Sequence, residues 1–167
     1  MKKLLVLLTS ALLSAVAFPA IVDIGSASDF ASVIPTATPD NTYRLTADPD
    51  FSEVSWTPCD FAAELDGNEK TVTGLTQPLF ETLSGSVHDL TLSGSRITQT
   101  TATTTLPFGC LVNALSGATV EDCRIVDCTC TTTVNDRDQR FGAVAGATVS
   151  GSAKNIIRNI TVAGCAL

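Results

Sequence analysis

The sequence predicts an all-β chain whose strands form a parallel β-helix with a short N-terminal cap. Two observations lead to this fold class. The 167 residues include 24 Thr and 14 Ser but only 4 Lys and 5 Glu, a composition rich in strand and turn formers and poor in helix formers. A pattern of apolar and polar residues also recurs after 33 and then 37 residues, a spacing typical of solenoids and propellers.

Residues 1–17 have the layout of a secretory signal peptide. Two lysines precede an apolar run over residues 4–13, and the small-residue triplet at 15–17 fits the A-x-A cleavage rule, so the mature chain is predicted to begin at Phe18. The apolar run is shorter than the about 20 residues that cross a bilayer, so no membrane span is expected after cleavage. The protein is therefore expected to be secreted or held at the cell surface.

The mature chain is predicted to have two parts. Residues 18–58 would supply the cap and the first strands, and residues 59–167 the stacked coils. Residues 29–34 are the only mature stretch with helical character, because prolines follow at 35 and 39. Residues 65–75 predict a turn at Asp-Gly-Asn followed by an alternating strand.

The recurring pattern defines the coils. Three segments, 87–92, 120–125 and 157–162, read apolar, polar, Asp or Asn, apolar, polar, apolar, and each follows a turn of small residues. A second predicted strand precedes each turn, at 79–83, 108–112 and 141–145, and a third follows at 95–101 and 126–134. Three short strands per repeat fit one coil of a β-helix better than a propeller blade of about four strands.

Stacking these segments predicts three columns of inward side chains. They are Val87 with Val120 and Ile157, Leu90 with Cys123 and Ile160, and Leu92 with Ile125 and Val162. Cys123 would thus be a packed thiol rather than a nucleophile.

The order of motifs resembles the GLUG-type β-helix repeats of bacterial surface and adhesin-like proteins. The resemblance covers roughly residues 24 to 167 and rests on these segments in order: Tyr43 to Ser52, Trp56-Thr57-Pro58, Leu65-Asp66-Gly67-Asn68, Gly74-Leu75 and Pro78-Leu79-Phe80. It implies a secreted, right-handed β-helix that is usually part of a longer surface protein. It implies no catalytic residues.

The outward polar positions decide between a binding module and an enzyme. His88, Asp89, Glu121 and Asp122 fall on adjacent coils, where a polysaccharide lyase or hydrolase would assemble its carboxylates. We interpret Asp89, Asp122 and Asn159 instead as a solvent-facing ladder, with Arg158 and Glu121 forming a cross-strand ion pair. The sequence therefore predicts a non-enzymatic module, structural or binding a glycan or a host or cell-surface protein, with a carbohydrate-active enzyme as the alternative.

Four further features carry functional predictions. The net charge of −7 argues against nucleic acid as a partner. No metal or cofactor is expected, because Asp48, Asp50, Asp136 and Asp138 are interpreted as turn formers. Threonine runs at 98–105 and 129–133 leave ice binding as a third alternative. A polar loop is the predicted contact surface, formed by Asn135, Asp136, Arg137, Asp138 and Arg140.

Six cysteines in an exported chain allow disulfides. Aligning the second and third coils places Cys128 opposite Cys165, which predicts a bond between them. Cys130 competes for Cys128, and the alternative is a stack of free thiols. The chain stops at Leu167 in mid-coil, so we expect either a truncated sequence or edge-to-edge self-association there.

Overall fold

A computed structural model describes residues 18–99, 107–133, 140–151 and 153–167 of the chain. Strands make up 49% of it and helices are few, which confirms the all-β prediction. The N-terminal elements are β1 (Ile21–Ile24), α1 (Ala27–Val33), the 3-10 turn η1 (Ile34–Thr36), β2 (Thr42–Leu45) and β3 (Glu64–Thr73). The helix expected at 29–34 is thus present, and it begins at an N-cap where the Ser26 hydroxyl accepts a hydrogen bond from the Asp29 amide.

The remaining strands fall into three repeats, defined here as residues 79–99, 107–133 and 140–167. The first holds β4 (Phe80–Leu83), β5 (Ser86–Ser93) and β6 (Arg96–Gln99). The second holds β7 (Pro107–Gly109), β8 (Val112–Leu115), β9 (Thr119–Glu121), β10 (Arg124–Val126) and β11 (Thr129–Thr132). The third holds β12 (Arg140–Gly142), β13 (Ala145–Thr148), β14 (Ile156–Arg158) and β15 (Thr161–Ala163).

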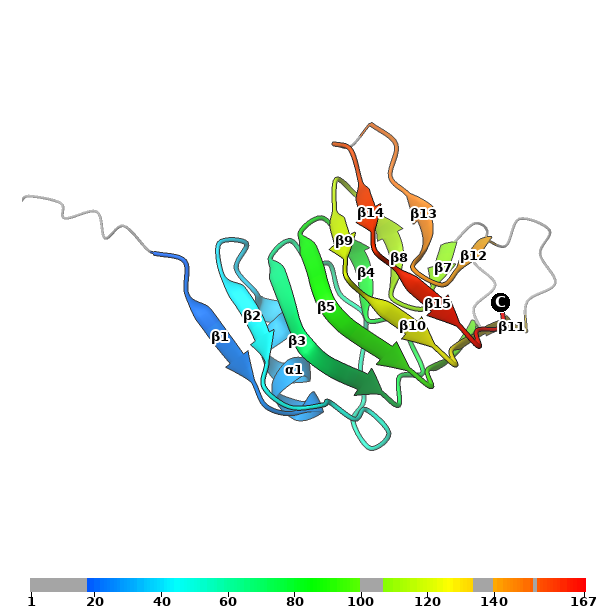
Figure 1. The fold of residues 1–167 in the computed structure, drawn as a ribbon, viewed down its shortest axis with the longest axis horizontal. Helices are drawn as coiled ribbons and strands as arrows, with labels where there is room; N and C mark the ends of the chain where they lie inside the picture. Colours follow the sequence, from blue (N-terminus) through cyan, green and yellow to red (C-terminus); the bar gives the residue numbers. More distant parts are fainter. Residues whose placement is uncertain (1–17, 100–106, 134–139, 152) are drawn as a thin grey trace, which may run out of the picture.

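Corresponding strands of the repeats pair with one another, and every pair within the described residues is parallel. The largest sheet runs β1-β2-β3-β5 and continues through β10 to β15, with β9 and β14 beside them (Figure 1). Three smaller sheets join β4-β8-β13, β6-β11 and β7-β12. Parallel strands cannot be joined by tight hairpins, so each strand is separated from its partner by the rest of a repeat.

The predicted stacking register is confirmed. Val87 pairs with Val120, which pairs with Ile157, and Leu92 pairs with Ile125, which pairs with Val162. The members of the three predicted columns in the first two repeats are at most 2% exposed. These columns therefore lie where the alternating pattern expects the core.

The strands predicted at 108–112 and 141–145 are each broken into two. Strand β7 ends at Gly109 and β8 begins at Val112, while β12 ends at Gly142 and β13 begins at Ala145. A Cβ added at Gly109 would lie 2.1 Å from the Val112 carbonyl oxygen, and one at Gly142 would lie 2.0 Å from that of Ala145. The chain folds back too tightly for any side chain here, so the glycines mark corners rather than strand interiors.

Residues 65–75 also differ from their prediction. Strand β3 runs through the Asp-Gly-Asn sequence instead of starting after it, and its register with β5 shifts between Asp66 and Lys70. Asn68 and Glu69 take positive φ angles of 47° and 60° at this shift. The left-handed residues therefore make a bulge inside a strand and not a turn before one.

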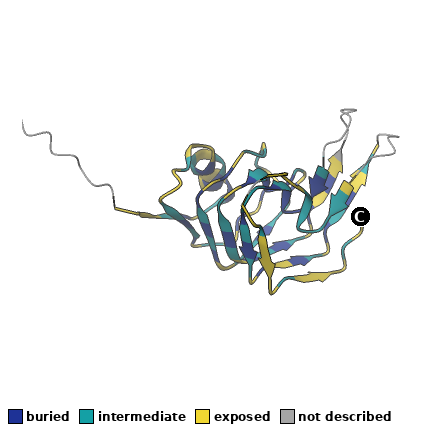
Figure 2. Cartoon of the chain, turned by 90° about the horizontal axis from the view of Figure 1, so that it is seen from above, coloured by how far each residue is buried: buried dark blue, intermediate teal, exposed yellow. Residues whose placement is uncertain are grey.

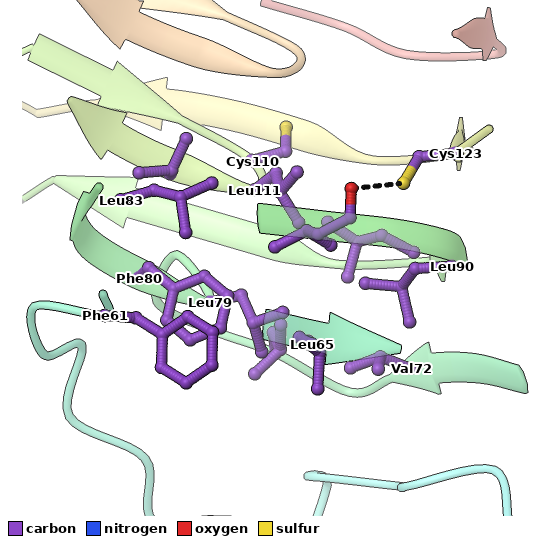
Figure 3. Packing of buried hydrophobic residues seen from close by; sticks show 14 of the residues in the cluster. Phe61, Leu65, Val72, Leu79, Phe80, Leu83, Leu90, Cys110, Leu111 and Cys123 are labelled. Atoms are coloured by element: carbon purple, nitrogen blue, oxygen red, sulfur yellow. Dashed lines mark hydrogen bonds between the residues drawn. The ribbon is translucent and has the colours of Figure 1, made fainter. Parts of the chain in front are cut away.

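The core changes in character along the stack. Near the N-terminus it is aromatic: Phe30 of α1 packs edge-on against Phe51 and Trp56, and Phe61 stacks on Phe80 with centroids 4.7 Å apart (Figure 3). In the column that starts at Phe80, Val112 and then Ala145 follow, so the interior side chains shrink toward the third repeat. The N-terminal segment is thus part of the same core.

The third repeat is covered on one side only within the described chain. Ile157 and Val162 are 50% and 49% exposed, although their column neighbours in the second repeat are buried (Figure 2). Strands β14 and β15 each pair with a single neighbour. Edge-to-edge self-association at these strands stays a prediction.

None of the helices in the described part has the length and apolar character needed to cross a membrane.

Candidate functional site

A ladder of left-handed residues runs across the largest sheet. Asp89, Asp122 and Asn159 each have φ of 52°, and the flanking pairs His88 with Glu121 and Thr91 with Arg124 place the first two residues in register. Asp and Asn tolerate this conformation better than other non-glycine residues, which explains why the third position of the repeated pattern is always one of them. The Asn159 amide donates to Asp122 Oδ1 at 2.9 Å.

His88 lies beside this ladder among three carboxylates. Its Nδ1 is 2.9 Å from Asp89 Oδ2, its Nε2 is 3.0 Å from Glu64 Oε1, and Asp66 Oδ1 lies 3.9 Å from Nδ1. Burial lowers the pKa of His88, but hydrogen bonds to Asp89 and Glu64 and the charge of Asp66 outweigh it, so the pKa is raised from 6.5. The imidazolium form satisfies both ring nitrogens at once.

The predicted pair of Arg158 with Glu121 is confirmed, since the guanidinium contacts Glu121 Oε2 on the neighbouring strand. Hydrogen bonding to Glu121 raises the pKa of Arg158. Glu121 is therefore engaged with a partner on the neighbouring strand.

A shallow groove of about 350 Å³ opens over the ladder. Its lining residues are Glu69, Asp89, Leu90, Thr91, Asp122 and Arg124. Three carboxylates, a hydroxyl and a guanidinium thus face one hollow, a set that can accept and donate hydrogen bonds to a polyhydroxylated ligand.

Among the described residues, Asp66, His88 and Asp89 form the one group with three ligand atoms within 4.8 Å of one another. Both nitrogens of this histidine contact carboxylates, Nδ1 that of Asp89 and Nε2 that of Glu64. Asp50 Oδ1 accepts from the Ser52 amide at 2.9 Å, and Asp48 Oδ1 accepts from the Thr71 amide at 2.7 Å. Asp50 thus bonds the backbone two residues on, as predicted for a turn former, whereas Asp48 bonds a strand 23 residues away; Asp136 and Asp138 lie outside the described residues.

The predicted contact loop is described only at its end. Asn135, Asp136, Arg137 and Asp138 lie outside the described residues, and Arg140 is an exposed residue at the start of β12. In the threonine runs, Thr98 and Thr131 are paired and their hydroxyls are 3.2 Å apart. Residues 100–105 of the first run are not described.

All six cysteines are free thiols in the structure. Cys123 is 2% exposed, and burial raises its pKa to about 11, in keeping with the predicted packed thiol. Its thiol points to the Val87 carbonyl (Figure 3). The bridge between Thr129 and Ala166 sets Cys128 opposite Cys165, so the predicted register is confirmed, while the bond between them stays a prediction.

Sequence reasoning missed two groupings. Glu64 and Asp66 reach His88 because β3 pairs with β5 at a spacing of 22 residues, shorter than the repeat that guided the alignment. Cys110 and Cys130 bring their Sγ atoms to 3.0 Å within a single repeat, where alignment of successive repeats carries no signal. Comparison of the chain with protein-family models, curated proteins and solved structures finds no match.

The raised pKa of His88 predicts a pH-dependent stability. Protonated His88 stabilises the fold fully below about pH 6.5, and this contribution is lost as the pH rises through the higher folded pKa. We expect the His88→Gln variant to unfold at lower urea than wild type at pH 5.5, with the gap narrowing by pH 8.5. Urea titrations at both pH values measure it.

Arg44→Gln is the matched control, because Arg44 contacts Asp23 at 2.8 Å on the same sheet in an ion pair that involves no histidine. Its effect should be the same at both pH values. If His88→Gln lowers the stability by the same amount at both pH values, the prediction that His88 is protonated in the fold is wrong.

Proposed function

We propose that the chain is a non-catalytic, exported module of a bacterial surface or adhesin-like protein, built as a right-handed parallel β-helix of the GLUG type, and that it binds glycans. The parallel pairing of corresponding strands supports the β-helix, each repeat being one coil. Export is supported by the signal-peptide pattern of residues 1–17.

One observation carries the non-catalytic part of the proposal. Two outward carboxylates bond the neighbouring repeat, since Glu121 pairs with Arg158 and Asp122 accepts from Asn159, while Asp89 contacts His88 on its own strand. A glycosidase needs one carboxyl group protonated and a second held free beside the scissile bond. Glu121 and Asp122 are each bonded to a side chain of the neighbouring repeat, an arrangement that supports a structural role for these carboxylates.

The groove over the ladder supports the choice of ligand. Asp89, Asp122 and Glu69 supply acceptors for sugar hydroxyls, and Arg124 supplies donors, all on one rigid sheet. The acidic lining and the net charge of −7 favour a neutral glycan over a polyanionic one. A surface module would hold such a ligand without changing it.

The test is binding and turnover measured together on a panel of neutral and acidic polysaccharides. We expect saturable binding to a neutral member, no new reducing ends or unsaturated products, and at least about tenfold weaker binding for Asp89→Asn with Asp122→Asn. Asparagine keeps the left-handed backbone and removes the charge, so the fold should remain.

Glu53→Gln is the matched control, since Glu53 lines a different hollow near Trp56. It should bind like wild type. Turnover of any polysaccharide that is lost in Asp89→Asn or Asp122→Asn would overturn the non-catalytic proposal in favour of a carbohydrate-active enzyme. Equal binding by the double variant and wild type would remove the groove as the ligand site.

A further inference from the structure

Four cysteines of the second and third repeats form a connected set, named here the thiol cluster: Cys110, Cys128, Cys130 and Cys165. The Sγ atoms of Cys110 and Cys130 are 3.0 Å apart. Cys110 also contacts Cys128, and Cys128 contacts Cys165. The first three are at most 2% exposed, so the sulfurs meet inside the core.

We propose that Cys110 and Cys130 form a disulfide in the exported protein. Cys110 lies at the corner between β7 and β8, and Cys130 lies on β11 of the same repeat. A disulfide has an S–S distance of about 2.05 Å, so the two sulfurs need to approach by about 1 Å. The bond would tie two walls of one repeat together across its interior. The inference rests on the proposed export, because an oxidising compartment is where such bonds persist.

This pairing resolves the competition for Cys128. Cys130 was a rival partner for Cys128, but its sulfur is held against Cys110. Cys128 is then left to Cys165, which stands opposite it through the Thr129 to Ala166 bridge. Cys59 and Cys123 lie outside the cluster, and the Cys123 thiol donates to the Glu121 carbonyl at 3.1 Å. The expected pattern is two disulfides and two thiols.

The arrangement of the sulfurs favours disulfides over a metal centre. Four thiolates around zinc at about 2.3 Å lie about 3.8 Å from one another, every sulfur near every other. Within the described residues, no three cysteine sulfurs lie within 4.8 Å of one another. The thiol cluster is instead a chain of close pairs, which is the geometry that pairwise bonding requires.

The oxidant we name is a small-molecule disulfide such as oxidised glutathione. Exchange begins with the thiolate of one of the two cysteines, for example Cys130. It attacks one glutathione sulfur and releases the first glutathione thiolate. The deprotonated Cys110 then attacks the Cys130 sulfur and releases the second. The cysteines lose two electrons and two protons, and one disulfide becomes two glutathione thiols. Because these side chains are buried, the exchange takes place during folding.

Peptide mapping tests the pairing. The full chain is reduced, unfolded, refolded in a mixture of oxidised and reduced glutathione, alkylated and digested without reductant. We expect a peptide linking Cys110 to Cys130, and alkylation at Cys59 and Cys123. Alkylated Cys110, or Cys110 joined to any other cysteine, would overturn the proposal. Since the protein is refolded in a test tube, this result does not depend on export, which cell fractionation tests separately.

Thermal unfolding supplies the second readout. We expect Cys110→Ser and Cys130→Ser each to lower the Tm of the oxidised protein by about 5 to 10 °C, and the double variant to add little. In the presence of reductant, the Tm of the wild-type protein should fall toward the Tm of these variants. Cys59→Ser, a half-buried cysteine outside the cluster, is the control and should shift equally in both redox states. If Cys110→Ser lowers the Tm by the same amount with and without reductant, the effect comes from packing alone, and the proposed disulfide is wrong.

Discussion

The Phe80→Ala variant is expected to lose about 3 to 5 kcal/mol of unfolding free energy, the range for removing a buried aromatic ring. Phe80 is fully buried, lies 4.7 Å from Phe61 in a stacked pair and 6.3 Å from Phe30 of the helix. Its loss would leave a cavity at the junction of the N-terminal segment and the first repeat. Urea unfolding followed by circular dichroism measures it, with the midpoint shifting and the slope retained.

Phe141→Ala is the matched comparison. Phe141 is only partly buried and packs against Phe108 at 6.5 Å in a tilted pair, so its loss opens a site that water already reaches. We expect Phe141→Ala to lower the free energy of unfolding by about 1 kcal/mol. Equal losses at the two positions would mean that the aromatic end of the core contributes no more than the third repeat.

The alternating pattern predicted the stacking because burial forces side-chain alternation within a strand. A slip of one residue would turn Val120 and Ile125 to solvent, so the column alignment had a single favourable register. The same reasoning placed Cys128 opposite Cys165, eight residues beyond the aligned pair Val120 and Ile157. Strand registers are thus readable from sequence where one face is buried.

Corners and short-period contacts were not readable in this way. Phe108 to Val112 has the composition of one strand, and only the steric limit at Gly109 shows that the chain turns there. Glu64 and Asp66 reach His88 from a strand 22 residues earlier, a spacing shorter than the 33 and 37 residues between the later repeats. A contact whose sequence spacing differs from the repeat length cannot be found by aligning repeats, even when each residue involved is identified as polar.

The ladder illustrates an intermediate case. The Asp or Asn at the third position of each pattern was visible as a polar residue between apolar ones, but strict alternation would turn Asp89 inward with Val87, whereas Asp89 is exposed. Its cause was not visible, because the left-handed φ of 52° at Asp89, Asp122 and Asn159 is a property of the folded backbone. The conformation, more than solvation, restricts the residue type there.

Gly85→Ala is expected to be the most damaging single methyl addition in the first repeat, costing about 3 kcal/mol or more from overpacking and a strained hydrogen bond. A Cβ at Gly85 would lie 1.9 Å from the Ala63 carbonyl oxygen and 2.6 Å from the Ala62 carbonyl carbon, both backbone atoms. That oxygen accepts the Ser86 amide at 2.9 Å, the bond that begins the pairing of β3 with β5. Relief of the clash therefore requires the two strands to separate at their first contact.

Two other glycines isolate the steric cause, with all three variants compared in one urea series. Gly25→Ala meets only side-chain atoms at 3.4 and 3.7 Å, so it should stay within about 0.5 kcal/mol of wild type. Gly94→Ala has open space but a φ of +64°, so left-handed strain alone should cost about 1 to 2 kcal/mol. If Gly85→Ala costs no more than Gly94→Ala, the β3 backbone yields to the methyl group, and the close approach of Ala63 to the turn does not fix the register of β3 on β5.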